Sequence, residues 1–163
     1  MKKGVLIFIL IISFQLLVVG CSKNSNGITS SEEKKVKETI DLVLSYKNGY
    51  DETMKKHISE KNFYVCNYVE FYSLYVGELN LEKYESSIVS IRNEDARYVV
   101  CMIINMEAKA LETHEDEKLS DEVVGEDVPV EVILKERNGE LYIEGFTEYE
   151  SLDKAKELNE GFK

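Results

Sequence analysis

The chain of 163 residues contains no tryptophan, one proline, two histidines and three cysteines, and each scarcity removes a class of protein. Collagen-like and mucin-like chains need many prolines, and a small disulfide scaffold needs many more cysteines. Basic residues are also the minority, with 20 Lys and Arg against 31 Asp and Glu, which gives a formal charge of −11. Because this charge repels phosphate backbones, the composition disfavours nucleic acid as a partner.

The apolar content of the chain is enough for one folded domain. Hydrophobic residues make up 44% of the sequence, and its length is that of a single domain rather than of a multidomain enzyme. The sequence has no nucleophile motif, no phosphate-binding loop and no nucleotide-binding glycine motif. It therefore indicates no cofactor and identifies no catalytic residue.

The first twenty residues have the pattern of a secretory signal. Lys2 and Lys3 precede the apolar stretch Val5–Val19. The 15 residues of this stretch are fewer than a transmembrane helix requires, and they suit the apolar region of a signal peptide. We therefore expect residues 1–20 to be removed from the mature protein.

The signal ends in the segment Val18-Val19-Gly20-Cys21. This segment resembles the lipobox of bacterial lipoprotein precursors, which has branched apolar residues, a small residue before the cleavage site and an obligatory cysteine. The resemblance implies that the thiol of Cys21 receives a diacylglycerol and that the new N-terminus can be acylated as well. Two or three acyl chains hold a protein stably at a bilayer, whereas one chain holds it only marginally. The alternative is an uncleaved membrane anchor in which Cys21 is an ordinary thiol.

This interpretation divides the chain into a signal peptide (1–20), a lipidated cysteine with a polar tether (21–30) and one domain (31–163). Cleavage removes two lysines and no acidic residue, so the formal charge changes from −11 to −13. Anionic headgroups repel such a domain, and the lipid must therefore anchor it. The predicted location is the extracytoplasmic face of the cell membrane.

Helical patterns occupy the first part of the predicted domain. Ser30 and Glu33 have the spacing of a capping box, and apolar residues recur at helical spacing after them. A short second helix is expected over residues 51–58, with Met54 and Ile58 facing inward. Residues 62–79 are rich in strand-favouring types, but their bulk recurs at helical spacing, which favours a third helix. The recurring residues are Tyr64, Tyr68, Phe71 and Tyr75.

Patterns of period two occupy the second part. Residues 85–91 and 97–111 are predicted strands, and the second has apolar residues on both faces, so we expect cover on both sides or a bulge at its centre. Residues 130–135 and 141–146 flank Asn138-Gly139, the strongest short signal for a hairpin. A short last helix is expected between Ser151 and Leu158.

Helices followed by an antiparallel sheet predict an α+β fold in which the helices pack on one face of the sheet. The order of elements and the closing hairpin resemble the nuclear transport factor 2-like superfamily, also called cystatin-like or ketosteroid isomerase-like, over about residues 31–150. The resemblance implies a strongly curved sheet and a cone between helices and sheet. Isomerases, dehydratases and cyclases of the superfamily work in this cone, whereas other members are noncatalytic binding domains. A helix-on-sheet domain of another topology is the alternative.

Several residues are candidates for chemistry. Cys66 and Cys101 can form a disulfide in an exported protein, but their apolar surroundings favour buried free thiols. Strand residues that can face a cone provide proton donors and carboxylates, although no spacing identifies a base among them. These residues are Tyr98, Glu107, Tyr142 and Glu144.

Metal-binding patterns are missing or incomplete. His57 and His114 are the only histidines, and no Cys-x-x-Cys or His-x-x-x-His spacing occurs, so no zinc site is predicted. Residues 112–127 carry eight acidic residues but lack the order of a calcium loop, which indicates a solvated connection between strands.

The function that these patterns favour is a surface-exposed bacterial lipoprotein that binds a protein or a small ligand without catalysis. The second hypothesis is a lipid-anchored enzyme of the isomerase or dehydratase kind. Solute capture for a transporter is a third, which the short chain disfavours. A carboxylate aimed into a closed apolar pocket would favour the enzyme, and a filled cone with an exposed aromatic patch would favour the binding protein.

Overall fold

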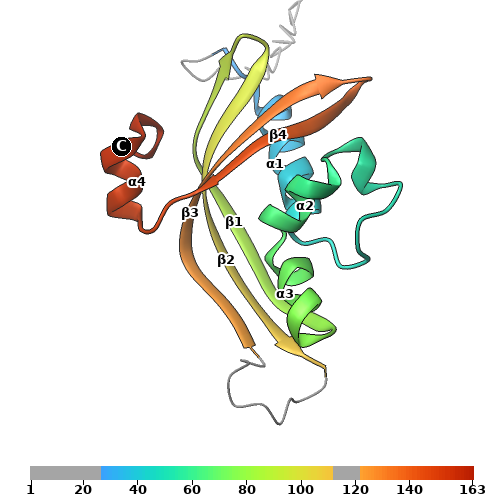
Figure 1. Cartoon of the computed structure of the whole chain (residues 1–163). Helices are drawn as coiled ribbons and strands as arrows, with labels where there is room; N and C mark the ends of the chain where they lie inside the picture. The colour runs from blue at the N-terminus through green and yellow to red at the C-terminus, as the bar shows by residue number, and fades with distance from the viewer. Residues whose placement is uncertain (1–26, 112–121) are drawn as a thin grey trace, which may run out of the picture.

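The structure, a computed structural model of the chain, describes residues 27–111 and 122–163 (Figure 1). The predicted signal peptide, Cys21 and His114 lie outside these residues. The described chain begins with helices, continues with four strands and ends with helices. In order, these are α1 (Ser30–Leu44), the 3-10 helix η1 (Met54–Lys56), α2 (Glu60–Cys66), α3 (Tyr68–Val76), β1 (Leu79–Glu94), β2 (Arg97–Ala110), β3 (Glu122–Arg137), β4 (Glu140–Glu148), α4 (Leu152–Leu158) and the 3-10 helix η2 (Glu160–Phe162).

The four strands form one antiparallel sheet in the order β1-β2-β3-β4. Asn138 and Gly139 join β3 to β4 with φ angles of 55° and 83°, as a two-residue type I′ turn requires, so the predicted hairpin is confirmed. Asp95 and Ala96 join β1 to β2 in the same way, with φ angles of 50° and 60°. Neither of these two residues is glycine, so the sequence lacked the usual hairpin signal there.

Bulges bend the long strands. β1 and β3 each run for 16 residues, and the register between neighbouring strands shifts at four places. Each extra residue bends its strand and increases the local twist. The sheet is therefore curved, and it bends around the helices (Figure 1).

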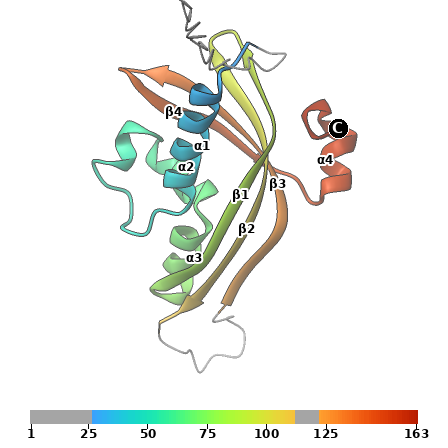
Figure 2. The ribbon, with the colours of Figure 1, turned by 180° about the vertical axis from the view of Figure 1, so that it is seen from behind.

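Figure 2 shows α1, α2 and α3 on one face of the sheet and α4 on the other. The prediction that the N-terminal helices pack on one face of the sheet is confirmed for α1–α3, whereas the short last helix, for which no face was predicted, packs on the other. The apolar residues on both faces of β2 explain the difference, because Cys101 faces away from α1–α3 and needs its own cover. Ala155 of α4 and Phe162 of η2 provide this cover, and all three residues are buried together.

Two apolar clusters, one under α1 and α2 and a smaller one under α3, fill the space between these helices and the sheet. The inward positions predicted for residues 51–58 are confirmed, since Met54 and Ile58 are fully buried. The predicted stripe of α1 is buried as well, against alternate residues of the strands. The fully buried members include Val36, Ile40, Val43, Phe63, Val100, Met102, Val132, Leu134 and Ile143.

The start of α1 differs from the prediction by one residue. The cap is Thr29, whose Oγ1 accepts the Glu32 N–H at 3.2 Å, while Glu32 Oε2 accepts the Thr29 N–H at 2.7 Å. Thr29 and Ser30 can each begin a capping box, because each is followed by a glutamate three residues later. The burial of the neighbouring Ile28 favours Thr29 as the cap. With Thr29 as the cap, Ile28 is buried in the core, and both residues belong to the domain although their composition suggested a tether.

The predicted third helix is two helices, α2 and α3, that meet at Asn67. The spacing of the bulky residues predicted helix correctly but did not identify the buried face. Phe63 and Val69 are buried, whereas Phe71 and Tyr75 are 37% and 63% exposed. Because Asn67 has an extended backbone, the period counted from residue 64 does not continue into α3.

The C-terminal segment lies so close to the sheet that Gly161 has no room for a side chain. A Cβ there would be 2.4 Å from Cys101 Sγ and 2.8 Å from Arg92 Nη1. We expect Gly161→Ala to cost roughly 1–3 kcal/mol of stability and to move η2 off the sheet, which exposes Cys101. Faster labelling of Cys101 by a thiol reagent, localised by mass spectrometry, measures this movement.

The matched control is Gly145→Ala. Its new Cβ would be 3.4 Å from Ile133 Cδ1, an ordinary van der Waals contact on the same sheet. We expect Cys101 to react in this variant at the wild-type rate. Equal rates in both variants would contradict the close packing at Gly161.

Candidate functional site

The space where the resemblance implies a cone is filled by side chains. Phe63, Met54 and Met102 are fully buried between α1–α3 and the sheet. Three surface hollows of the described chain lie elsewhere: beside η1 and the β3–β4 turn, between the C-terminal segment and the sheet, and over β2–β4. Charged or polar residues line much of them. The fold therefore shows an apolar interior rather than an open, carboxylate-lined pocket in the part that the structure describes.

Two of the predicted cone residues lie at opposite ends of β2. The hydroxyl of Tyr98 donates to Glu32 Oε1 at 3.3 Å, and its pKa is raised by burial and then by the charge of Glu32. Glu107 lies near the other end of the strand, where it pairs with Lys109 at 3.3 Å. The two side chains do not converge.

The other two predicted cone residues, Tyr142 and Glu144, lie on β4, and cationic side chains contact both of them. The guanidinium of Arg137 stacks over the ring of Tyr142, 4.8 Å from its centre. Glu144 pairs with Lys135 and, at 3.0 Å, with Arg97. Hydrogen bonding to Lys135 and then to Arg97 holds the pKa of Glu144 below its usual value. A carboxylate that is stabilised in its charged form by two cations is a poor general base.

A polar cluster between α1 and β1 comes closest to a catalytic arrangement within the described ranges. Asp41 Oδ1 accepts hydrogen bonds from Tyr84 at 3.0 Å and Ser86 at 2.5 Å, and Asp41 Oδ2 accepts one from Lys37 at 2.6 Å. Lys37 also donates to Ser86 Oγ at 2.7 Å. Burial and then the charge of Asp41 raise the pKa of Tyr84.

This cluster is internally satisfied. Asp41 already accepts three hydrogen bonds, and Lys37 donates to Ser86 rather than accepting its proton. Other residues line the hollows described for the surface. The cluster therefore joins α1 to β1, with no base free to act on a substrate.

The two described cysteines are free and buried, and they lie in different clusters. Cys66 lies in the core beside α1–α3, and burial raises the pKa of its thiol to about 12. Cys101 lies under α4 and η2 on the other face of the sheet, where burial also raises its pKa. The structure thus adopts the free-thiol alternative, and the two residues do not form a disulfide.

His57 covers the outer edge of β4. Its Nδ1 lies 2.9 Å from the carbonyl oxygen of Leu141, and its own carbonyl accepts the Ile143 N–H at 2.7 Å. Among residues 27–111 and 122–163, no group of three His, Cys, Asp or Glu side chains is placed to hold a metal ion. His57 has a role in closing the sheet edge.

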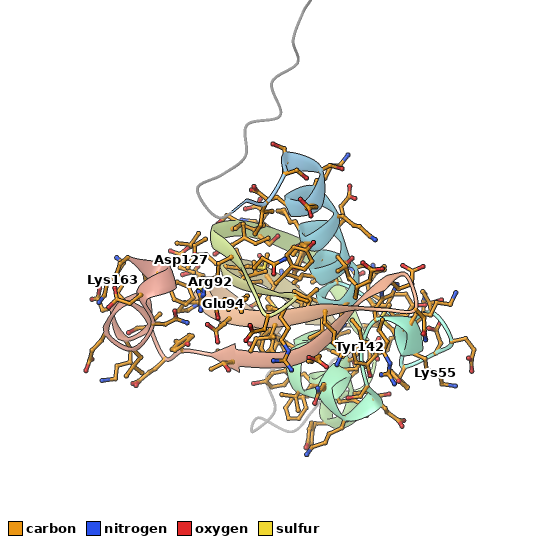
Figure 3. The ribbon with its side chains drawn as sticks, turned by 90° about the horizontal axis from the view of Figure 1, so that it is seen from above. Lys55, Arg92, Glu94, Asp127, Tyr142 and Lys163 are labelled. Atoms are coloured by element: carbon orange, nitrogen blue, oxygen red, sulfur yellow. The ribbon has the colours of Figure 1, made fainter. Side chains whose placement is uncertain are left out.

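A groove lies between η1 and the turn that joins β3 to β4. It has a volume of about 570 Å³, and its lining includes Lys55 and Tyr142, which lie on the same side of the molecule in Figure 3. Both signs of charge line it, since Glu52 and Glu140 accompany the basic residues. Three basic and two acidic side chains line the groove, so its charge is mixed.

An apolar outer surface on α2 and α3 was not predicted from the sequence. Five large side chains there are between 37% and 63% exposed, and we call them the α3 surface. They are Val65, Phe71, Tyr72, Leu74 and Tyr75.

The remaining residues of α3 explain why this surface is unusual. The buried face of α3 holds Val69 and Val76. The one acidic residue of the helix, Glu70, is tied to the loop after α1, because its Oε1 accepts the Gly49 N–H at 3.0 Å. A surface helix normally carries polar residues on its outer side, and a helix that is apolar all round is normally covered. Seven of the nine residues 68–76 are aromatic or aliphatic, more than one buried side of a helix needs, and this excess is the signal that could have identified the surface.

The α3 surface lies far from the start of the domain. In Figure 1, α1 begins at the top of the molecule and α3 lies at the bottom, next to the end of β2. Within the described ranges, no helix has the length and apolarity needed to cross a membrane. The first described residues, which lead into α1, lie at the opposite end of the domain from α3 (Figure 1).

No protein-family model matches the chain, and the search of curated proteins gives no match. One solved structure that is similar to it has a title beginning Rd1NTF2_05. The two chains are 12% identical with a TM-score of 0.44, and the match covers 73% of this chain and 96% of the other. The architecture itself is established by the strands and helices described above, as an α+β domain with α1–α3 on one face of a curved four-stranded antiparallel sheet.

Proposed function

We propose that this protein is a surface-exposed, lipid-anchored binding module that docks a partner protein and catalyses no reaction. The α3 surface is the observation that carries the proposal. Contiguous apolar patches on soluble proteins mark interaction sites, and Tyr and Phe are among the residues that dominate binding energy at interfaces. In this chain such residues cover a whole side of one helix, although the rest of the domain is strongly charged.

The filled interior supports binding over catalysis. An isomerase or dehydratase of this architecture needs an open cone with a base aimed into it. Tyr98 and Glu107 lie at opposite ends of β2, Tyr142 and Glu144 lie on β4, and each of the four has a neighbouring partner. No observation on the described chain favours the enzyme hypothesis.

We include in this proposal a fold of the nuclear transport factor 2-like superfamily. The order of the helices, the bulged antiparallel sheet and the position of α1–α3 on its inner face support it. The filled cone and the cover that α4 gives to the outer face fit the noncatalytic binding domains of that superfamily.

The lipobox supports the proposed lipid anchor. We expect Cys21→Ala to abolish metabolic labelling by a fatty acid, since only a thiol can form the thioether. Ser22→Ala is the matched control and should keep the fatty-acid labelling. Fatty-acid labelling that persists in Cys21→Ala would contradict the anchor.

Docking is tested by the size of the complex in detergent extracts of native membranes. We expect the wild type to migrate well above the mass of one chain, and a variant with Leu74→Ser and Tyr75→Ser to migrate as the monomer. Both residues are 63% exposed, so their loss changes stability by only about 0.5 kcal/mol.

The control for this variant is Leu158→Ser on α4. Leu158 is also 63% exposed, but it lies on the other face of the sheet. The control should migrate with the wild type. A monomeric wild type, or a double variant of unchanged size, would refute docking through the α3 surface.

A further inference from the structure

We infer that the groove between η1 and the β3–β4 turn binds a diffusible small molecule through a carboxylate or phosphate group. This site goes beyond the proposed docking function and is separate from it. In Figure 1 the β3–β4 turn lies near the top of the molecule, whereas α3 lies at the bottom. The volume of the groove, about 570 Å³, is that of a pocket for a small organic ligand.

The charge of this groove differs in sign from that of the whole protein. Lys55, Lys56 and Arg137 line it together with Glu52 and Glu140, so basic residues exceed acidic ones. The whole chain, in contrast, has a formal charge of −11. Because the net charge repels anions, a lining with an excess of basic residues provides a place where an anion can be received.

Two of the three cations in the groove have no carboxylate partner. Glu52 forms an ion pair with Lys55. Neither Lys56 nor Arg137 forms an ion pair with a carboxylate of the described chain. Glu140 is the remaining acidic residue of the lining, and its single charge balances only one of these two cations. The groove therefore keeps a positive charge that is available to a ligand.

Tyr142 holds the guanidinium of Arg137 in place. Arg137 lies opposite Glu140 in the register of β3 and β4, and Tyr142, two residues after Glu140, shares this face of the hairpin. The guanidinium carbon of Arg137 lies 4.8 Å from the centre of the Tyr142 ring. No described residue accepts a hydrogen bond from this guanidinium. Its planar fork of N–H donors matches two oxygens of a carboxylate or phosphate.

Amide chemical-shift titration of the full-length chain in micelles of an uncharged detergent tests the inference. The probes are citrate and inorganic phosphate, each compared with NaCl at the same ionic strength. We expect saturable shifts at Lys55, Lys56 and residues 137–142 with at least one probe, and none with NaCl. A further sample holds the chain in nanodiscs that contain phosphatidylglycerol, whose headgroup is the other source of phosphate.

Charge variants locate the site. Arg137→Gln should weaken binding at least roughly tenfold, because it removes charge-assisted hydrogen bonds. The matched control is Lys156→Gln, which removes the same charge from an exposed lysine of α4 that also lacks an ion pair in the described chain. This control should bind as the wild type does. Glu140→Gln should bind about twofold to fivefold more tightly, because a competing carboxylate is gone.

Substitution of Tyr142 tests how the guanidinium is positioned. Tyr142→Leu keeps every charge of the groove but removes the ring, so we expect binding to weaken by about twofold to fivefold. Tyr142→Phe brings back the ring and should restore the affinity. Equal losses in these two variants would overturn the positioning role of the ring.

The outcomes separate this site from the docking function. The absence of saturable shifts with both probes would overturn the inference, and so would equal affinities of Arg137→Gln and Lys156→Gln. Shifts at the groove that require phosphatidylglycerol, and appear with neither free probe, would overturn a diffusible ligand. Docking through the α3 surface is measured independently, by the size of the complex in membrane extracts.

Discussion

Phe63→Ala is expected to lower the free energy of unfolding by about 3–5 kcal/mol, whereas Phe71→Ala should change it by less than about 1 kcal/mol. Phe63 is fully buried, and its ring lies 5.2–6.5 Å from the rings of Tyr46, Tyr50 and Tyr64. Its loss leaves a cavity at the centre of the core. Phe71 is 37% exposed and belongs to the α3 surface.

Urea denaturation of the wild type and the two variants measures this difference. The midpoint should fall strongly for Phe63→Ala at an unchanged slope, since the surface exposed on unfolding stays nearly the same. The comparison also tests which face of residues 60–76 is buried. Equal losses in both variants, or a greater loss at Phe71, would contradict the burial of Phe63 and the exposure of Phe71.

The second large effect is expected at Asn67, a fully buried polar residue at the junction of α2 and α3. Its Nδ2 donates to the carbonyls of Val43 at 2.8 Å and Tyr46 at 2.9 Å, and its Oδ1 accepts the Glu70 N–H at 3.0 Å. Asn67→Ala removes the cap of α3 and leaves two carbonyls of the α1 end without this donor. We expect a loss of roughly 3–5 kcal/mol.

Asn62→Ala is the control for this prediction. Asn62 makes one side-chain hydrogen bond, from Nδ2 to the Glu144 carbonyl at 3.3 Å, so its loss should cost about 1 kcal/mol. Amide exchange of α3 adds a local measurement, because loss of the cap should speed exchange there in Asn67→Ala more than in Asn62→Ala. Similar stabilities for the two variants would contradict the bridging role of Asn67.

Local preferences explain what could be predicted. Asn138-Gly139 specifies a hairpin because both residues adopt positive φ easily, and the apolar period of α1 specifies a helix with one buried side. The apolar residues on both faces of β2 correctly predicted cover on both sides. Each of these features depends on residues that are neighbours in the sequence.

The α3 surface could not be predicted from such local preferences. The spacing of Tyr64, Tyr68, Phe71 and Tyr75 predicted helix, but it did not reveal a break at Asn67. That break depends on carbonyls of the α1 end, more than 20 residues earlier in the chain. A residue stabilised by distant partners leaves no local periodic signal.

The sequence by itself determined the α+β class, the closing hairpin, the helical stretches and the strong negative charge, and it predicts the lipobox cysteine. These properties follow from composition, backbone preferences and short-range periodicity. Only the tertiary structure decided that the interior is filled, that α4 covers the outer face and that the aromatic side of α3 is exposed. The physical reason is that an apolar side chain favours burial equally against any apolar neighbour, so its position depends on which elements the whole fold brings against it.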